Sequence, residues 1–134
     1  MGPRPPQAPR RGEIYRIDPN PVAGREMRDP HHWIVLTPEA VNVHGVVIAV
    51  VVSTVAGGAR AAGLTVPVVA GGVTGVAVCT HLRSFDLRAR LQDGSARRTG
   101  IAPDDVVDDI AARVASLIET AEPRRPVAAR ARGR

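Results

Sequence analysis

The run VVIAVVVS, residues 46–53, decides the fold class of this chain. It is nearly continuous in apolar residues and rich in β-branched valine, a composition typical of strands. An uninterrupted apolar run of this length predicts a strand that is covered on both faces. The apolar stretch continues only to Ala56 and is too short to span a bilayer. We therefore expect a central strand of a small β-rich domain, and no membrane association.

Shorter strand-like segments, separated by turns, lie on both sides of this run. Proline and glycine make residues 18–32 a loop, and Pro67 limits its own strand to a sheet edge. Pro38 fits the start of a short helical turn, and RAR (88–90) a short helix. The predicted strands are EIYRID (13–18), WIVLT (33–37), GLTVPVV (63–69) and GVAVCTHL (75–82), the last followed by RSFDL (83–87) and a turn at Asp93-Gly94.

The clearest helix is the last element. Pro103 stands at its start, Asp104 and Asp105 complement the positive end of the helix dipole, and Pro123 ends it. Its apolar stripe consists of Val106, Val107, Ile110, Val114, Leu117 and Ile118. Together the elements predict a mainly β (α+β) fold: a small barrel of antiparallel strands with short helices and a C-terminal amphipathic helix.

The length of 134 residues fits one domain with its own core. We expect a basic, disordered arm at 1–11, a folded domain at 12–121 and a disordered Arg-rich tail at 122–134. The N-terminus has no apolar stretch of a secretory signal, and the single cysteine, Cys79, excludes an internal disulfide. Cys79 is expected in the core, and the protein in the cytoplasm.

The positive charge is concentrated at the ends of the chain. All 18 basic residues are arginine; residues 1–12 and 122–134 together carry +7 of a total of +5, which leaves −2 for the middle. Basic arms can favour nucleic-acid binding through phosphate neutralisation. Genomic base bias explains the same composition, so the charge alone leaves the partner open.

Five segments give the chain its resemblance to a known family. They are RRGEIYRIDPNP (10–21), GREM (24–27), WIVLTPEAVN (33–42), ARAAGLTVPV (59–68) and LRSFDLRARL (82–91). In this order and spacing, over about residues 10–120, they resemble the MazF/PemK toxin family, particularly its ChpB-like branch. The resemblance implies an SH3-like barrel related to CcdB, a homodimer, and a metal-independent endoribonuclease without cofactors. Its expected substrate is single-stranded RNA, cut at short sequences to a 2′,3′-cyclic phosphate and a 5′-hydroxyl. A MazE/PemI-like antitoxin, bound through its C-terminal segment, is the expected partner, with operator DNA reached through the antitoxin.

The resemblance also implies where the catalytic residues lie. The family's loop arginine falls on His31, and the proline after it on His32. Imidazole cannot reproduce a guanidinium fork, but it can serve as general acid or base near neutral pH. The family's hydroxyl position falls on Ser53, with Thr54 beside it. An exposed loop pair of histidines, and a serine that only satisfies backbone groups, remain the alternatives.

Other positions are expected to contact RNA. Arg25 and Arg28 are available to supply the missing charge, and where some relatives have Arg-Cys-Asp this chain has Val78-Cys79-Thr80. The predicted RNA-binding residues are Arg25, Glu26, Arg28, His32, Arg60, Thr80, His81 and Arg83. For Arg60 and Arg83, solvated ion pairs are the alternative. The three aromatics, Tyr15, Trp33 and Phe85, are expected in the core, and no metal site is expected.

Two other functions compete with the nuclease. The substituted positions His31, Val78 and Thr80 are consistent with an impaired relative that binds antitoxin in a DNA-bound repressor complex. A CcdB-like partner of a topoisomerase is the third reading, and the five segments fit it less well.

Overall fold

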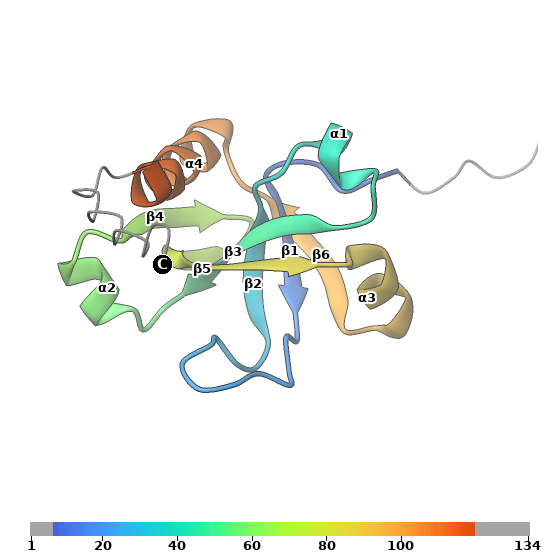
Figure 1. Cartoon of the computed structure of the whole chain (residues 1–134), viewed down its shortest axis with the longest axis horizontal. Coiled ribbons are helices and arrows are strands. Elements are labelled where there is room, and N and C mark those ends of the chain that lie inside the picture. Colours follow the sequence, from blue (N-terminus) through green and yellow to red (C-terminus); the bar gives the residue numbers. More distant parts are fainter. Residues whose placement is uncertain (1–6, 120–134) are drawn as a thin grey trace, which may run out of the picture.

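A single antiparallel sheet of six strands, curled on itself and flanked by helices, makes up the fold (Figure 1). The computed structural model describes residues 7–119, and the strand order is β4-β5-β3-β2-β1-β6. The strands are β1 (Glu13–Ile17), β2 (His31–Val35), β3 (Val47–Ser53), β4 (Thr65–Ala70), β5 (Val73–Phe85) and β6 (Ala96–Ile101). The helices are α1 (Glu39–Asn42), α2 (Gly57–Ala61), α3 (Leu87–Asp93) and α4 (Asp104–Glu119). The predicted mainly β fold is confirmed.

The apolar run is β3, which lies between β5 and β2 inside the sheet. Its side chains alternate between two buried clusters, as the period of two in a strand requires. Val50 and Val52 belong to the first cluster, and Val47, Ala49 and Val51 to the second. Coverage on both faces explains why the run carries almost no polar residue. The prediction is confirmed for the strand except at Ile48, which is 42% exposed.

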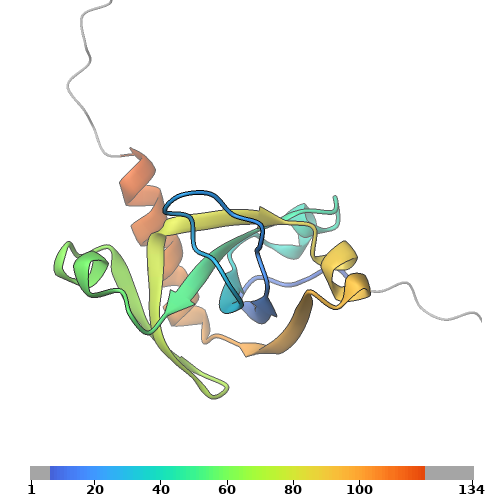
Figure 2. The ribbon, with the colours of Figure 1, turned by 90° about the horizontal axis from the view of Figure 1, so that it is seen from below.

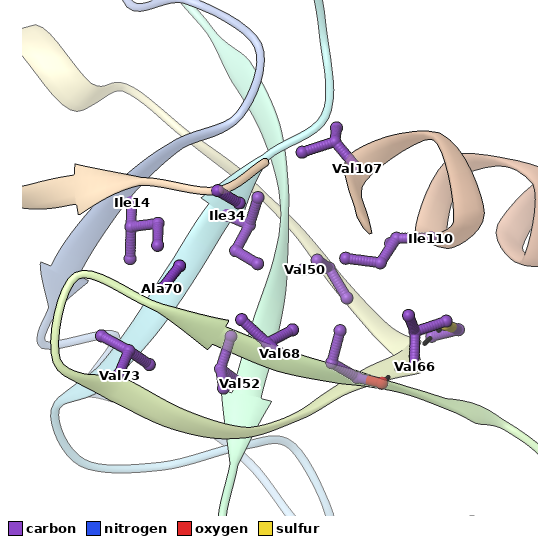
Figure 3. Packing of buried hydrophobic residues seen from close by; sticks show 13 residues of the cluster. Ile14, Ile34, Val50, Val52, Val66, Val68, Ala70, Val73, Val107 and Ile110 are labelled. Carbon is purple, nitrogen blue, oxygen red and sulfur yellow. Dashed lines mark hydrogen bonds between the residues drawn. The ribbon is translucent and has the colours of Figure 1, made fainter. Parts of the chain in front are cut away.

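The first cluster packs between the sheet and α4 (Figure 3). Val107 and Ile110 of α4 are fully buried against residues such as Ile34 and Val68. Cys79 is buried in the same cluster, as expected, and burial raises the pKa of its thiol. The members of this cluster are Ile14, Ile34, Val50, Val52, Val66, Val68, Ala70, Val73, Ala77, Cys79, Ala102, Val107 and Ile110.

The predicted apolar stripe of α4 extends further along the helix than its buried side chains do. Val106 and Val114 are partly buried against the first cluster, but Leu117 is 37% exposed and Ile118 75% exposed. The last turn therefore covers little apolar surface among residues 7–119. Pro123, the expected stop, lies outside the described residues.

The second cluster holds the three aromatic side chains on the other face of the sheet. Tyr15, Trp33 and Phe85 are each less than 5% exposed, as expected for core residues. The rings of Trp33 and Phe85 meet edge to face with centroids 4.8 Å apart. Met27 of the β1–β2 loop and Ala59 of α2 pack against this cluster from outside. Two connecting segments therefore cover the face on which the candidate site lies.

Several elements differ from the prediction. Residues 75–87 were expected as two strand pieces, whereas β5 is one strand of 13 residues. β6 and α2 were not predicted, since ARRTGI and GGARA carry little hydrophobic periodicity. β2 begins at His31, two residues earlier than expected. The edge position that Pro67 predicts is confirmed, because β4 is the first strand of the sheet.

The described chain before β1 is attached to the domain. Arg11 forms an ion pair with Asp108 of α4 at 3.0 Å, and Asn42 donates a 2.7 Å hydrogen bond to the Pro9 carbonyl oxygen. The expected arm 1–11 and tail 122–134 lie largely outside residues 7–119. Within the part of the chain that the structure describes, no helix is long and apolar enough to cross a membrane.

The crossing of β5 over β3 depends on a glycine. A Cβ atom at Gly75 would lie 2.7 Å from the backbone oxygen of Ser53, closer than real side chains come. We expect Gly75→Ala to lower the free energy of unfolding by about 1–3 kcal/mol, the usual effect of overpacking. Urea denaturation measures it. The control is Gly58→Ala in α2, where no atom lies within 4 Å of the added methyl group. An unchanged free energy of unfolding in Gly75→Ala would contradict this prediction, because it would show that β5 can move away from β3 without cost.

The only tyrosine has an unusual acidity. Burial and the neighbouring charge of Glu13 raise the pKa of Tyr15 to about 12, from an ordinary value of 10.0. We expect tyrosinate absorbance at alkaline pH to appear about two units later in the folded protein than in urea. Glu13→Gln should bring the two titrations closer, because it removes a charge that opposes ionisation. Coincident titrations in the folded and unfolded wild type would contradict the burial argument.

Candidate active site

A hollow of about 420 Å³ lies where the β1–β2 loop faces the middle of β5. Figure 2 shows the loop passing across β5. Of the predicted site residues, the hollow brings together Arg25, Glu26, Thr80, His81 and Arg83, which come from segments more than 50 positions apart. Met27, Trp33 and Leu82 complete its lining. The site is thus polar at its rim and apolar at its base.

A bulge in β5 makes this hollow possible. Val50 pairs with Leu82 and Val52 with Ala77, so four residues of β5 stand opposite the single residue Val51. Such an insertion bends its strand and redirects side chains, and bulges are common beside active sites. The bulge turns Thr80 and His81 toward the loop rather than along the sheet. Of the two, Thr80 is exposed and His81 half-buried.

Hydrogen bonds give the β1–β2 loop a defined shape. Asn20 and Asp29 clamp its two ends: the Asn20 amide group donates to the Asp29 carboxylate and accepts from the Asp29 N–H, both at 3.1 Å. Glu26 accepts from the Ala23 N–H at 2.7 Å. The proline and glycine content of the segment predicted a loop but not these side-chain contacts, which join residues up to nine positions apart.

Arg83 anchors the loop rather than standing free. It donates a 2.8 Å hydrogen bond to the Pro19 carbonyl oxygen, and Arg90 donates one of 2.8 Å to the Asp18 carbonyl oxygen. Both guanidinium groups also lie over the Phe85 ring, 5.3 and 5.0 Å from its centroid. Arg90 was not predicted as a site residue, because only the fold brings it under the loop.

His31 and Ser53 are neighbours across two strands. His32 of β2 pairs with Val52 of β3 and Trp33 with Val51, so His31 and Ser53 are the next residues on these two adjacent strands. His31 shares its face with Trp33, two residues further along β2, which lines the hollow. The expectation that His31 and His32 lie in the loop was wrong, because both belong to β2 and pair with Ile17 and Arg16.

The two predicted hydroxyl residues, Ser53 and Thr54, lie in different environments. Ser53 is only 3% exposed, and its Oγ accepts a 3.2 Å hydrogen bond from the Val55 N–H. That contact is the backbone-capping role weighed as an alternative above. Thr54, the next residue, is exposed. Ser53 keeps its hydroxyl proton for a further acceptor, whereas Thr54 is open to a ligand from solution.

Two buried nitrogen atoms beside the hollow lack partners. Nδ1 of His81 and Nε1 of Trp33 are shielded from solvent, and no hydrogen-bond partner for them is found within residues 7–119. A buried polar atom left unpaired typically costs about 1–3 kcal/mol. Both residues line the hollow, so these two nitrogen atoms without hydrogen-bond partners lie where a ligand would bind.

The remaining predicted residues lie away from the hollow. Arg28 donates a 3.1 Å hydrogen bond to the Gly24 carbonyl oxygen within the loop, and Arg60 is exposed on α2. His32 faces the opposite side of the sheet from His31. Among residues 7–119, no three His, Cys, Asp or Glu side chains are grouped so that they could hold a metal ion.

The curled six-strand sheet with short helices and a C-terminal helix is a fold that this chain shares with solved MazF toxin structures. The family described as "PemK-like, MazF-like toxin of type II toxin-antitoxin system" matches residues 10–118. The chain therefore belongs to this family.

Individual relatives agree. The endoribonuclease toxin ChpB of Escherichia coli K12 is 32% identical over 112 residues, which cover 81% of this chain and 93% of ChpB. Endoribonuclease PemK of Escherichia coli is 30% identical and covers 81% and 80%. The crystal structure of MazF from Deinococcus radiodurans superposes with a TM-score of 0.70 at 32% identity, covering 83% of this chain and 96% of that one.

His32 makes the free energy of unfolding decrease as the pH falls. Burial, then the charges of Arg16, Arg97 and His31, lower the pKa of His32 below its ordinary value of 6.5. The unfolded chain therefore takes up a proton before the folded one, and stability is lost as pH falls below about 6.5. We expect His32→Gln to lose less stability than the wild type between pH 7 and 5 in urea denaturation. His44→Gln, at an exposed histidine, should behave as the wild type; equal slopes for all three would refute the assignment.

Proposed function

We propose that this chain is an active endoribonuclease toxin that cuts single-stranded RNA at the hollow between the β1–β2 loop and β5. The observation that supports this most is the grouping of Arg25, Glu26, Thr80 and His81 around one hollow. His31 lies on the same face of β2 as Trp33, which lines the hollow. The proposed products are a 2′,3′-cyclic phosphate and a 5′-hydroxyl, formed at short recognition sequences without metal. Its place of action is the cytoplasm.

The chemistry needs a base, an acid and a positive charge. The 2′-hydroxyl must lose a proton, the phosphorane must be stabilised and the leaving 5′-oxygen must gain a proton. His31 and His81 supply two imidazoles on one side of the sheet, one from β2 and one from the bulge of β5. Arg25, exposed at the rim, supplies the charge to the phosphate oxygens.

The other polar residues position the RNA. Thr54 and Thr80, both exposed, donate hydrogen bonds to phosphate or ribose oxygens, while Ser53 orients the chain beneath them. Glu26 accepts hydrogen bonds from base edges and holds the loop through Ala23. Arg28 and Arg60 contribute at the periphery. Arg83 acts indirectly, through its bond to the loop.

An antitoxin and a second copy of the chain are the proposed protein partners. Solved structures of MazE–MazF from Deinococcus radiodurans superpose with a TM-score of 0.63 at 29% identity. In such a complex the antitoxin occupies the RNA site, and the pair is directed to operator DNA through the antitoxin. The exposed apolar side chains Val43, Val46, Ile48 and Leu91 offer surface for a protein contact.

A second candidate function follows from one buried side chain. Val78, where some relatives carry arginine, is only 3% exposed in the second cluster and offers nothing to RNA. A protein that has lost cleavage and only binds antitoxin would retain this fold unchanged.

Cleavage of a long single-stranded RNA in excess chelator tests the proposal. We expect cleavage by the wild type and a loss of about 10²–10⁴-fold in His31→Ala and His81→Ala, the usual contribution of a general acid or base. Arg25→Gln should also lose activity. The control is His44→Ala, at a residue between α1 and β3, and this variant should keep its activity. The 5′ ends of the products should lack phosphate.

The outcomes separate the candidates. Intact RNA after incubation with folded wild type would refute the nuclease and support the antitoxin-binding alternative. Cleavage that survives in both histidine variants would leave an RNase but refute this assignment of residues. Circular dichroism of each variant excludes loss of folding as the cause.

A further inference from the structure

Three basic side chains form a row on the face of the sheet opposite the hollow. The register pairs Arg97 of β6 with Arg16 of β1, and Arg16 with His32 of β2. Residues directly opposite on adjacent strands point to the same face. Arg16 alternates with Ile14 and His32 with Ile34, both members of the first cluster, so the row continues that face beyond the core.

Within the described part of the chain, no carboxylate forms an ion pair with this row. The ion pairs between residues 7 and 119 join Arg10 to Glu39, Arg11 to Asp108 and Arg98 to Glu13, and none includes Arg16 or Arg97. Arg97 is exposed, and Arg16 and His32 are half-buried. Like charges placed directly opposite each other destabilise a sheet. The fold therefore holds Arg16 and Arg97 opposite each other, beside His32, at the expense of its own stability.

The neighbouring arginine shows that charge is compensated elsewhere on the same strand. Arg98 follows Arg97, pairs with Tyr15 across the sheet and so points to the other face. There it meets the carboxylate of Glu13. One strand thus carries one neutralised and one unneutralised arginine, on opposite faces.

We propose that Arg97, Arg16 and His32 form a second phosphate-binding row that holds the RNA backbone away from the site of cleavage. This rests on the proposed function. His31 and His32 are consecutive and point to opposite faces at the start of β2, so the row meets the cleavage face at this rim. A single strand that leaves the hollow beside His31 reaches the row by crossing the end of β2. Contacts to the phosphates add affinity and fix register without reading sequence.

A polyanion is the ligand that this chemistry fits. A guanidinium pair spaced by one strand can bind successive phosphodiester oxygens, and the imidazole of His32 can donate a hydrogen bond between them. Phosphate contacts release counterions, so each makes RNA binding more sensitive to salt. The row is short and lacks aromatic platforms, which favours backbone contact over base stacking.

Salt dependence of RNA binding tests the row. The probe is a 2′-O-methylated single-stranded RNA, which lacks the attacking hydroxyl and cannot be cleaved. We expect Arg16→Gln and Arg97→Gln each to reduce the slope of log K against log salt by about 0.7, the value for one phosphate on a single strand. Arg97→Lys should keep the slope, because the point charge remains. Arg98→Gln, on the opposite face, should leave the slope unchanged.

Stability gives an independent readout. Arg16→Gln and Arg97→Gln should unfold at the same or higher urea concentration than the wild type, since each relieves repulsion. Arg98→Gln should unfold earlier, because it breaks the pair with Glu13. Lower stability of Arg16→Gln and Arg97→Gln would mean that these residues are structural and would overturn the proposal.

The possible results remain distinguishable. If the wild type binds RNA and the slopes of all variants are equal, the row is refuted and the nuclease stands. If the wild type binds no RNA, both proposals fail. If Arg16→Gln and Arg97→Gln lose binding of a decaglutamate peptide but keep the RNA slope, the row is a site for an acidic protein segment and the RNA proposal is overturned.

Discussion

The close approach of β5 to β3 is the constraint on which the rest of the molecule depends. Gly75 has no side chain, so β5 can pass against the backbone of Ser53 at a distance that a Cβ atom would forbid. Further along, four residues of β5 stand opposite the single residue Val51 before β5 pairs with β3 again. The bulge that results is what turns Thr80 and His81 out of the sheet and toward the loop.

The loop, in turn, is located by the same strand. After the bulge, β5 continues to Arg83 and Phe85, and the Arg83 guanidinium donates to the first residues of the loop while resting on the Phe85 ring. Arg83, which was predicted to bind RNA, attaches the β1–β2 loop to β5. The two segments that line the hollow, the β1–β2 loop and β5, lie far apart in the sequence. The path of β5 positions both of them.

The fold was predictable where hydrophobic patterning is strong. The valine run of β3, the edge strand marked by Pro67 and the helix that begins at Asp104 all carry a local signal that tertiary packing reinforces. β6 could not be predicted in this way, because ARRTGI has no apolar alternation, with Arg97 and Arg98 on opposite faces, and is held by pairing with β1. The helix stripe was overestimated at Ile118, since periodicity does not reveal where a helix passes the edge of its sheet.

The candidate site was predictable only in part. The resemblance to the family named Arg25, Glu26, Thr80 and His81, and the structure brings these four residues around one hollow although more than 50 positions separate the two groups. They did not reveal the anchoring contact of Arg83, which depends on a loop carbonyl with no sequence signature.

The two faces of the sheet differ in how they treat charge, and this difference has a physical consequence. On the face that carries the hollow, Glu13 neutralises Arg98 and backbone carbonyls accept from Arg83 and Arg90, so these cations are used in structural contacts. On the opposite face Arg16 and Arg97 form no ion pair within residues 7–119, and burial together with their positive charge lowers the pKa of His32. A fold selected for stability alone has no reason to retain that repulsion. An anionic ligand removes it on binding, so the same charges that weaken the free protein strengthen its complex.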